Sequence, residues 1–368
     1  MEEFLIPLAS DLIRMKNTSR EAINKSAEYC ANWLLKQGLS VKVVENKGLK
    51  SVVATAGQPD SGKTLILNGH LDVVPGEESD FIPRVEAGKL FGRGSYDMLG
   101  AVAAMMVATA EAAKQNASCQ VMLQLVPDEE TGGAHGTGFL VEEGARGDFV
   151  ICGEPTNLQI AVQAKGVLQL LVETSGIAAH GSRPWLGKNA ITHAFETYKR
   201  IEQLEFLQAS STFFPKPSFN LAKVAGGGAI NQVPDHCAFY LDIRYLPNQD
   251  VDRILDQIRQ TVSDASVTVL QQGAPVQTDE NDRFVRLLQQ TTSELTGSSV
   301  RLFGQDGSAD TRYYARHAIP AIEFGPIGAN HHGPDEFVDI DSLYVYQRIL
   351  NRFITNIDER MILHETEK

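Results

Sequence analysis

The sequence has few cysteines, and they form no spaced motif. Only four occur in 368 residues. They stand far apart in apolar segments, at Cys30, Cys119, Cys152 and Cys237. A disulfide framework or a zinc site built from cysteines needs a denser pattern. We therefore expect four small, reduced core side chains.

Positive charge is also scarce. The chain has 33 lysines and arginines against 46 aspartates and glutamates, which gives a formal net charge of −13. Nucleic acids and anionic membranes bind proteins through basic surfaces, so neither is an expected partner. An anionic substrate would have to be held by a local arginine or by a metal ion.

Long apolar segments are missing as well. The longest run of small apolar residues, 101–110, is too short to cross a bilayer. The N-terminal residues Met1-Glu2-Glu3-Phe4 lack the basic region and apolar core of a signal peptide. We therefore expect a cytoplasmic protein.

The length and the order of apolar patterns predict two domains. Strand and helix patterns alternate up to residue 164 and return after residue 276, which is typical of an α/β fold with a mixed sheet flanked by helices. Residues 165–275 instead read as strand–helix–strand–strand–helix–strand, a ferredoxin-like α+β order. We predict a catalytic domain, residues 1–164 and 276–368, interrupted by this smaller domain.

Local signals place several elements of the first domain. A buried, alanine-rich helix is expected at 99–115, and an earlier helix is expected to begin at a capping box made by Thr18 and Glu21. Buried strands are expected at 64–68, 120–126 and 149–152.

Acidic and imidazole side chains follow each of these three strands. They are His70, Asp72, Glu129, Glu130 and Glu154. In an open α/β sheet, ligands bind at the carboxyl ends of the strands, so these side chains are expected to meet at one edge. A histidine that binds a metal needs its second ring nitrogen held by an acceptor, which Asp72 can provide for His70. The alternative for this pair is a surface histidine beside a turn aspartate.

The adjacent pair Glu129–Glu130 gives a sharper signal. Like charges side by side are costly unless a cation holds them. Neighbouring side chains also diverge, so one glutamate can bind a metal while the other acts as a general base.

Asp97 and His332 complete the set. Asp97 ends a glycine-rich segment before the helix at 99–115, where it could simply cap the helix or could bridge two metals. His331 and His332 point in different directions, so at most one should be a ligand. Five ligands of this kind can hold two divalent metals about 3.5–4 Å apart, which is a hydrolytic arrangement.

These motifs resemble those of the zinc aminoacylase family that includes acetylornithine deacetylase, succinyl-diaminopimelate desuccinylase and carboxypeptidase G. The resemblance covers nearly the whole chain and is carried by residues 69–75, 92–98, 128–130, 153–156 and 332–336. It implies two zinc ions per subunit, with cobalt or manganese as possible substitutes. The implied ligands are His70 and Glu154 for one metal, Glu130 and His332 for the other, and Asp97 between them. Asp72 would orient His70, and Glu129 would be the general base.

The resemblance extends to the inserted domain, which in the family is a lid and dimerisation domain. His180, in the segment 179–184, resembles the lid histidine that stabilises the oxyanion in the other subunit, so a homodimer is implied. Asn231 and Arg244 match positions that bind the substrate's carboxylate, for which the planar fork of arginine is suited. The alternative for Arg244 is a salt bridge with Asp242. Asp310 and Arg312 resemble a loop on the substrate side.

The expected reaction is removal of an acyl group from an N-acyl amino acid by amide hydrolysis. The main alternative is a dipeptidase or carboxypeptidase of the same family, with a dipeptide as substrate. A non-catalytic binding protein and a single structural metal are weaker alternatives. Structural zinc prefers closed cysteine and histidine sets, which argues against the single structural metal. An acidic stretch, 77–80, replaces a tryptophan common in the family, so the acyl group stays open.

Overall fold

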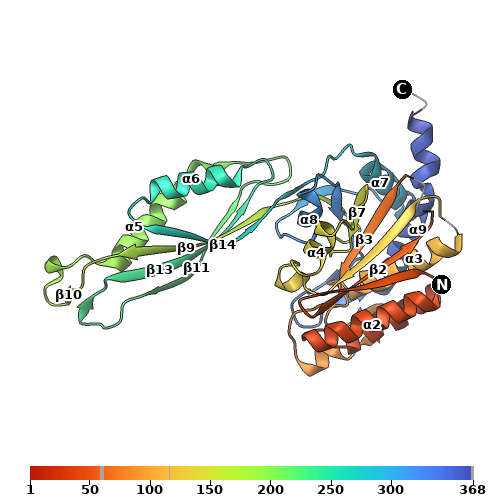
Figure 1. Cartoon of the computed structure of the whole chain (residues 1–368), viewed down its shortest axis with the longest axis horizontal. Coiled ribbons are helices and arrows are strands. Elements are labelled where there is room, and N and C mark those ends of the chain that lie inside the picture. The colour runs from red at the N-terminus through yellow and green to blue at the C-terminus, as the bar shows by residue number, and fades with distance from the viewer. Residues whose placement is uncertain (59–61, 116, 366–368) are drawn as a thin grey trace. The chain divides into compact units, whose positions relative to one another are not determined.

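The computed structural model describes residues 1–58, 62–115 and 117–365 (Figure 1). The chain divides into two compact units. The first contains Met1–Val162, Gln277–Phe303 and Ala309–Lys368, and the second contains Gln163–Val276 and Gly304–Ser308. The inserted domain was expected at 165–275, so the second unit begins two residues earlier, ends one residue later and includes a short additional segment.

The first unit is built on a mixed sheet with the strand order β1-β2-β6-β3-β7-β17-β8. Its central strands β6, β3, β7 and β17 are parallel to one another. The bounds are β1 Ser40–Asn46, β2 Leu49–Ala56, β3 Thr64–His70, β6 Gln120–Val126, β7 Phe149–Cys152, β8 Ile160–Ala164 and β17 Ala321–Glu323. His70 lies opposite Val126, and Asn68 lies opposite Cys152, so these strands end along one edge of the sheet.

Helices cover both faces of this sheet (Figure 1). Gly69 of β3 faces α3, since a Cβ atom there would meet Val102 and Met98, whereas Ile66 packs with Val141 of α4 and Tyr314 of α8. Residues of opposite parity on a strand point to opposite faces. The helices of this unit are α1 Leu5–Arg14, α2 Arg20–Lys36, α3 Leu99–Gln115, α4 Thr137–Glu142, α7 Arg283–Thr296, α8 Thr311–Ala315 and α9 Ile340–Glu365. Helix α3 is buried along most of its length, as its alanine-rich sequence predicts.

A second, smaller sheet in this unit joins distant parts of the chain. Its order is β18-β19-β5-β4, with bounds Gly328–Ala329, Phe337–Asp339, Lys89–Phe91 and Arg84–Glu86. Phe337 lies opposite Phe91 in the antiparallel pair β19–β5. The turn before β19 therefore lies beside the turn after β5.

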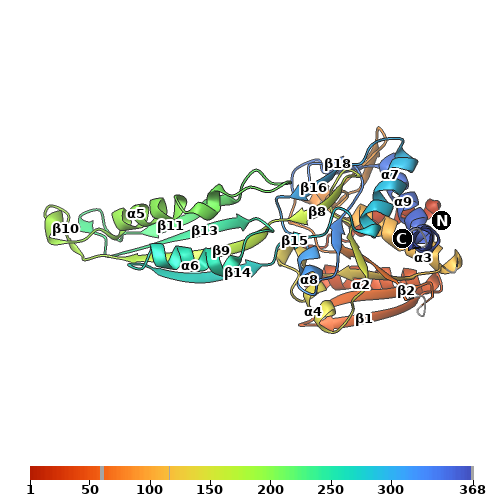
Figure 2. The same cartoon turned by 90° about the horizontal axis from the view of Figure 1, so that it is seen from above.

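The second unit has the predicted ferredoxin-like order. Its sheet runs β11-β13-β9-β14 (Figure 2), and α5 and α6 pack on one face of it (Figure 1). The bounds are β9 Gly166–Ser175, α5 Ala190–Glu202, β11 Ser218–Gly226, β13 His236–Tyr245, α6 Val251–Thr261 and β14 Ser266–Gly273. A separate two-stranded ribbon pairs β10 Ala179–His180 with β12 Gln232–Val233.

The short strands β4, β5, β18 and β19 were not predicted, and one helix start was misplaced. Ser19, not Thr18, caps α2, because its side chain accepts a hydrogen bond from the N–H of Ala22. The remaining short strands are β15 Val276–Gln277 and β16 Leu302–Gln305. Within the described residues, none of the helices combines the length and the apolar character needed to cross a membrane.

Candidate metal centre

The first group of candidate ligands lies where β3 and β7 end. His70 is the last residue of β3 and is buried, Glu154 follows β7, and Asp97 stands two residues before α3. Nε2 of His70 lies 3.2 Å from Oδ1 of Asp97 and 4.0 Å from Oε1 of Glu154. Three separate segments thus bring one imidazole and two carboxylates together, as the parallel strand ends predict.

The second group shares Asp97 but uses its other oxygen. Nε2 of His332 lies 3.2 Å from Oδ2 of Asp97 and 3.1 Å from Oε1 of Glu130. In each group the candidate ligand atoms lie within 4.8 Å of one another. Asp97 is therefore placed to bridge two cations.

The donor set fits two divalent metals. Ligand atoms at the usual zinc bond lengths around a tetrahedral ion lie about 3.3 Å apart, close to the imidazole–carboxylate distances here. Among the described residues, neither a lysine nor an arginine forms an ion pair with Asp97, Glu130 or Glu154. A buried carboxylate cluster of this kind is stabilised by cations from outside the chain.

The pKa values of the cluster reflect this missing positive charge. Burial raises the pKa of Glu154 well above its ordinary value, and nearby Asp97 adds to the effect. Hydrogen bonds to Asp97 and Glu130 raise the pKa of His332 to about 10. The metal-free centre therefore holds protons where cations would bind, and metal binding must release them.

Asp72 supports the centre in a way that differs from the prediction. Nδ1 of His70 lies 2.8 Å from the main-chain oxygen of Asp72, whereas the Asp72 carboxylate is 3.6 Å away. That carboxylate accepts hydrogen bonds from the main-chain N–H groups of Glu129 and Glu130, at 3.1 and 2.9 Å. Asp72 thus orients His70 through its backbone and holds the Glu129–Glu130 turn through its side chain.

Glu129 lies beside the ligands without belonging to either group. Burial raises the pKa of its carboxyl to about 8; His70 opposes the rise, and the carboxylates of Asp310 and Asp97 add to it. A carboxyl near neutral pKa beside a metal pair is a candidate general base. Its neighbour Glu130 belongs to the second candidate ligand group, so the two adjacent glutamates differ in their surroundings.

Sequence reasoning missed several residues that hold the turn after β6. Asp128 accepts hydrogen bonds from the main-chain N–H groups of His135 and Gly136, both at 2.8 Å. Arg312 and Tyr313 donate to the main-chain oxygen of Gly132. Arg312, expected on the substrate side, is buried here. Arg312 binds a main-chain oxygen, and a contact of this kind cannot be predicted from residue types.

The structure brings His180 and Asn231 together within the second unit. The N–H of Gly181 donates to the main-chain oxygen of Asn231 at 2.6 Å, and both side chains are exposed. Asn231 precedes the first residue of β13, whereas Arg244 lies near the last residue of this strand, opposite Val167. It donates to Asp242 through Nε at 2.7 Å and through Nη2 at 3.1 Å. The salt bridge considered from the sequence is therefore present.

Two candidate ligand groups that share one aspartate at the carboxyl edge of a sheet, with a further glutamate beside them, are typical of a metal-dependent hydrolase. The sequence comparison defines the group further: residues 66–356 match the peptidase family M20/M25/M40, and the chain belongs to this family. The protein is a hydrolase that acts on amide bonds, as the sequence motifs predicted.

Known relatives match the chain over most of its length. It is 30% identical over 335 residues to a succinyl-diaminopimelate desuccinylase from Paracidovorax citrulli, covering 84% of this chain and 85% of that protein. It is 28% identical over 349 residues to an acetylornithine deacetylase from Proteus mirabilis, covering 89% and 88%. The crystal structure of aminopeptidase PepT from Bacillus cereus has the same fold, with a TM-score of 0.83, 19% identity, and coverage of 96% and 98%.

Proposed function

We propose that the chain is a dinuclear metal-dependent amidohydrolase that removes the acyl group from an N-acyl amino acid. The observation that carries this proposal is the sharing of Asp97 by two ligand groups, with Glu129 beside them and outside both. The names of the two relatives above, a desuccinylase and a deacetylase, support this class of reaction.

The five ligands have distinct places in this proposal. His70 and Glu154 hold one metal, Glu130 and His332 hold the other, and Asp97 bridges them. Zinc is the preferred assignment, and cobalt or manganese suits the same ligands. When bound, the metals polarise the amide carbonyl and lower the pKa of a water molecule between them.

Glu129 moves the proton in this reaction. Its carboxylate takes a proton from the attacking water and passes it to the nitrogen of the leaving amine. Asp72 fixes this position, because its side chain binds the N–H groups of both Glu129 and Glu130. The proposal thus assigns one residue to proton transfer and another to its placement.

His180 is proposed to stabilise the oxyanion in the active site of a second subunit. The main-chain N–H of Ser182 donates to Nδ1 of His180 at 3.1 Å. Because Nδ1 accepts a hydrogen bond, the neutral imidazole carries its proton on Nε2. An N–H donor on an exposed ribbon is the group that a developing oxyanion requires.

Arg244 and Asn231 are proposed to hold the free carboxylate of the amino-acid half, with Asn231 supplied, like its neighbour His180, by the second subunit. Asp242 uses two of the five N–H donors of Arg244 and fixes the plane of its guanidinium. The remaining donors suit a substrate carboxylate. The salt bridge is compatible with this role because it orients the side chain without exhausting its donors.

A homodimer through the second unit is part of the proposal. A small apolar hollow on this unit is lined by Ala194, Phe195, Tyr198, Leu221, Val224 and Phe239. Phe195 is 55% exposed, and β11 is an edge strand of its sheet. Such a patch beside an open strand edge suits a second copy of the chain. Phe195→Asp should shift the sedimentation of a dimer toward that of a monomer.

The reaction is tested by release of free amine from a panel of N-acetyl amino acids, N-succinyl amino acids and dipeptides. Chelated enzyme is compared with enzyme refilled with zinc or cobalt. Cleavage of the N-acyl compounds that returns with metal supports the proposal. Metal-dependent cleavage of dipeptides alone would identify a dipeptidase, and two bound metals with no cleavage of any compound would overturn the assignment.

The placement of the four cysteines also supports a reducing compartment. Cys30, Cys119, Cys152 and Cys237 are buried, and the described residues contain no disulfide. A cytoplasmic location is therefore part of the proposal.

A further inference from the structure

A buried carboxylate outside both ligand groups, Glu336, lies at the junction of two loops. Its exposed fraction is 3%. Oε1 accepts hydrogen bonds from the main-chain N–H groups of Tyr96 and Asp97, both at 3.0 Å. Oε2 accepts from the N–H of Gly94 at 3.0 Å and from Nη1 of Arg93 at 2.9 Å. The last residue in the loop that it holds is the bridging ligand itself.

Every partner of Glu336 is a donor. Three are main-chain N–H groups and the fourth is a guanidinium, so the two carboxylate oxygens accept two hydrogen bonds each. A glutamine of the same shape would offer one oxygen and one NH₂ group, and the NH₂ group would face two donors. A buried donor left without an acceptor is costly, so the loop that ends at Asp97 would have to move.

The backbone of the loop at 92–97 depends on these hydrogen bonds from outside the loop. Gly94 has φ +81°, and a Cβ atom there would lie 2.7 Å from side-chain atoms of both Leu99 and Val73. The main chain is therefore pressed against its neighbours in a conformation that favours glycine. Glu336 supplies acceptors for the N–H groups of Gly94, Tyr96 and Asp97 from another part of the chain.

Glu336 also stands just after the turn that carries His332 and ties its end to the loop at 92–97. Asn330, His332 and Asp335 have φ values of +64°, +61° and +52°. Non-glycine residues in this left-handed region are strained and persist only where surrounding contacts hold them. The main-chain oxygen of Glu336 accepts a hydrogen bond from the N–H of Gly92 at 2.9 Å. One residue thus fastens the loops of two metal ligands that lie far apart in the sequence.

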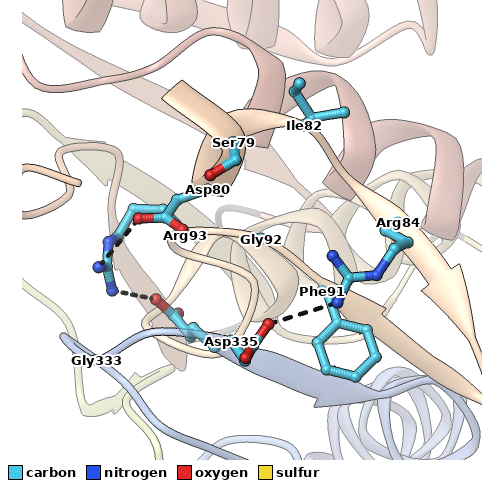
Figure 3. Close-up of a pocket in the computed structure, with 10 residues that line it drawn as sticks. Ser79, Asp80, Ile82, Arg84, Phe91, Gly92, Arg93, Gly333 and Asp335 are labelled. Atoms are coloured by element: carbon cyan, nitrogen blue, oxygen red, sulfur yellow. Dashed lines mark hydrogen bonds and ion pairs between the residues drawn. The ribbon is translucent and has the colours of Figure 1, made fainter. Parts of the chain in front are cut away.

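Arg93 supplies the positive charge that Glu336 needs when buried. It is 5% exposed, and its guanidinium approaches Asp80 at 3.9 Å (Figure 3). The same guanidinium forms an ion pair with Glu336 at 2.9 Å. Both Arg93 and Glu336 line a cavity of about 80 Å³. The main-chain oxygen of Asp80 also accepts from the N–H of Arg93, at 2.7 Å. The acidic stretch noted in the sequence is therefore part of this support.

We propose that Glu336 is a positioning residue for both metals, because it fixes Asp97 and His332 relative to each other. The inference rests on the proposed function only in requiring two bound metals. A purely structural role would lower the stability of the protein and leave the metal affinity of the folded protein unchanged. The dissociation constants of the metals, measured on folded protein without substrate, separate the two roles.

The experiment compares five proteins: wild type, Glu336→Gln, Glu336→Asp, Arg93→Lys and Asp335→Asn. Each is stripped of metal, checked for folding by circular dichroism, and titrated with zinc by calorimetry and with cobalt by visible absorption. Asp335 is the matched control, since it is the neighbouring residue, its side chain is 73% exposed, and asparagine tolerates its positive φ.

Glu336→Gln should bind both metals about 10–100-fold more weakly and should change the cobalt spectrum, since Asp97 contributes to both groups. Glu336→Asp should recover part of the affinity, because it keeps the charge. Asp335→Asn should match wild type. Arg93→Lys keeps three of the four hydrogen bonds and should show a smaller loss, which keeps the proposal testable if Glu336→Gln fails to fold.

Wild-type affinity for both metals in folded Glu336→Gln, or in Arg93→Lys where Glu336→Gln does not fold, would overturn the positioning role and leave the proposed function intact. Fewer than two metals bound by the wild-type protein would overturn both.

Discussion

Two acidic clusters, one in each unit, differ in the source of their positive charge. In the first, Asp97, Glu130 and Glu154 gather around two histidines without a lysine or arginine partner among the described residues. In the second, Asp264 lies 2.8 Å from Nε2 of His193 and 2.9 Å from Nη2 of Arg200. One cluster is completed only by cations from solution, whereas the other is completed by the chain itself.

The pKa shifts have opposite signs for this reason. Burial without a cation raises the pKa of Glu154 well above its ordinary value, whereas the hydrogen bond from His193 lowers the pKa of Asp264 to about 2, with Arg200 adding to the effect. Within the first cluster Asp97 differs from Glu154: burial opposes the change, but hydrogen bonds from His332 and His70 lower the pKa of Asp97. The comparison thus contrasts a cluster whose nearby positive charge comes only from histidines with one that also has an arginine.

Metal removal should have the largest effect, and this effect should be confined to the first unit. Chelation should abolish amide hydrolysis and should lower protection from hydrogen exchange at the ends of β3 and β6. Amides of β9 in the second unit should keep their protection. Each site saturated at 100 times its dissociation constant contributes about 2.7 kcal/mol to the folded state. Hydrogen exchange read by mass spectrometry measures both units in one experiment.

Refilling the chelated protein with metal gives a second, independent readout, the release of protons. Since the pKa of His332 is raised to about 10, its imidazole is protonated at pH 7 in the metal-free protein. A metal needs the neutral ring, so refilling should release protons into an unbuffered solution, and affinity should rise with pH. Equal loss of protection in both units, or binding without proton release, would contradict the comparison.

Replacing the proposed base should affect activity while leaving the metals in place. Glu129→Gln should lower kcat by about 10²–10⁴-fold, because the side chain keeps its shape but no longer accepts a proton. Metal content, measured by atomic emission, should stay at two per chain. Glu143→Gln, an exposed change at the end of α4, is the control. Full activity in Glu129→Gln would remove this residue from the mechanism.

The pH profile sharpens this prediction. The pKa of Glu129 is about 8 without cations, and two divalent ions nearby should lower it by favouring the carboxylate. Because the ionised form is the active one, kcat/KM should fall as pH decreases through that lowered pKa. The residual activity of Glu129→Gln should lack this acidic limb.

The sequence predicted that the candidate ligands would lie together because their positions follow from the fold. His70 ends an apolar strand, Glu130 and Glu154 follow apolar strands, and the carboxyl ends of parallel strands meet at one edge. In the sequence, Glu336 was identified only as the last residue of the motif at 332–336. Its partners are mainly backbone N–H groups near Asp97, 239 positions away along the chain. Such contacts depend on the β5–β19 pairing, and these strands of three residues are too short to leave a periodic pattern.

Asp72 and Ser19 illustrate the same limit at short range. The sequence placed an acceptor two residues after His70, but backbone geometry decides that the main-chain oxygen of Asp72, not its carboxylate, reaches the ring. Thr18 and Ser19 both carry a hydroxyl, and only the observed bond to the N–H of Ala22 distinguishes the cap. Residue types indicate the chemistry available, while the atom used depends on φ and ψ.

A change in the second unit should affect catalysis without affecting metal binding. His180→Gln should lower kcat by about 10²–10³-fold, the range seen when an oxyanion donor is lost. Its metal content should equal that of wild type. His236→Gln is a matched control, because this exposed histidine pairs with Glu173 at 3.1 Å in the same unit. Wild-type kcat in His180→Gln would restrict the second unit to structural roles.

The smallest expected effect is that of replacing Asp264, which pairs with His193 and Arg200. The pKa of Asp264, about 2 in the folded protein, is below its unfolded value of about 3.9, so its stabilisation is present above about pH 4 and is lost as pH falls toward 2. Because this side chain is nearly half exposed, Asp264→Asn should destabilise the second unit by less than about 1 kcal/mol at pH 7. Urea unfolding followed by hydrogen exchange of α5 should show this difference shrinking below pH 4, with Asp256→Asn on exposed α6 as the control. A difference that grows in acid would mean that His193 and Arg200 do not hold Asp264 ionised, and the contrast between the two units would fail on that side.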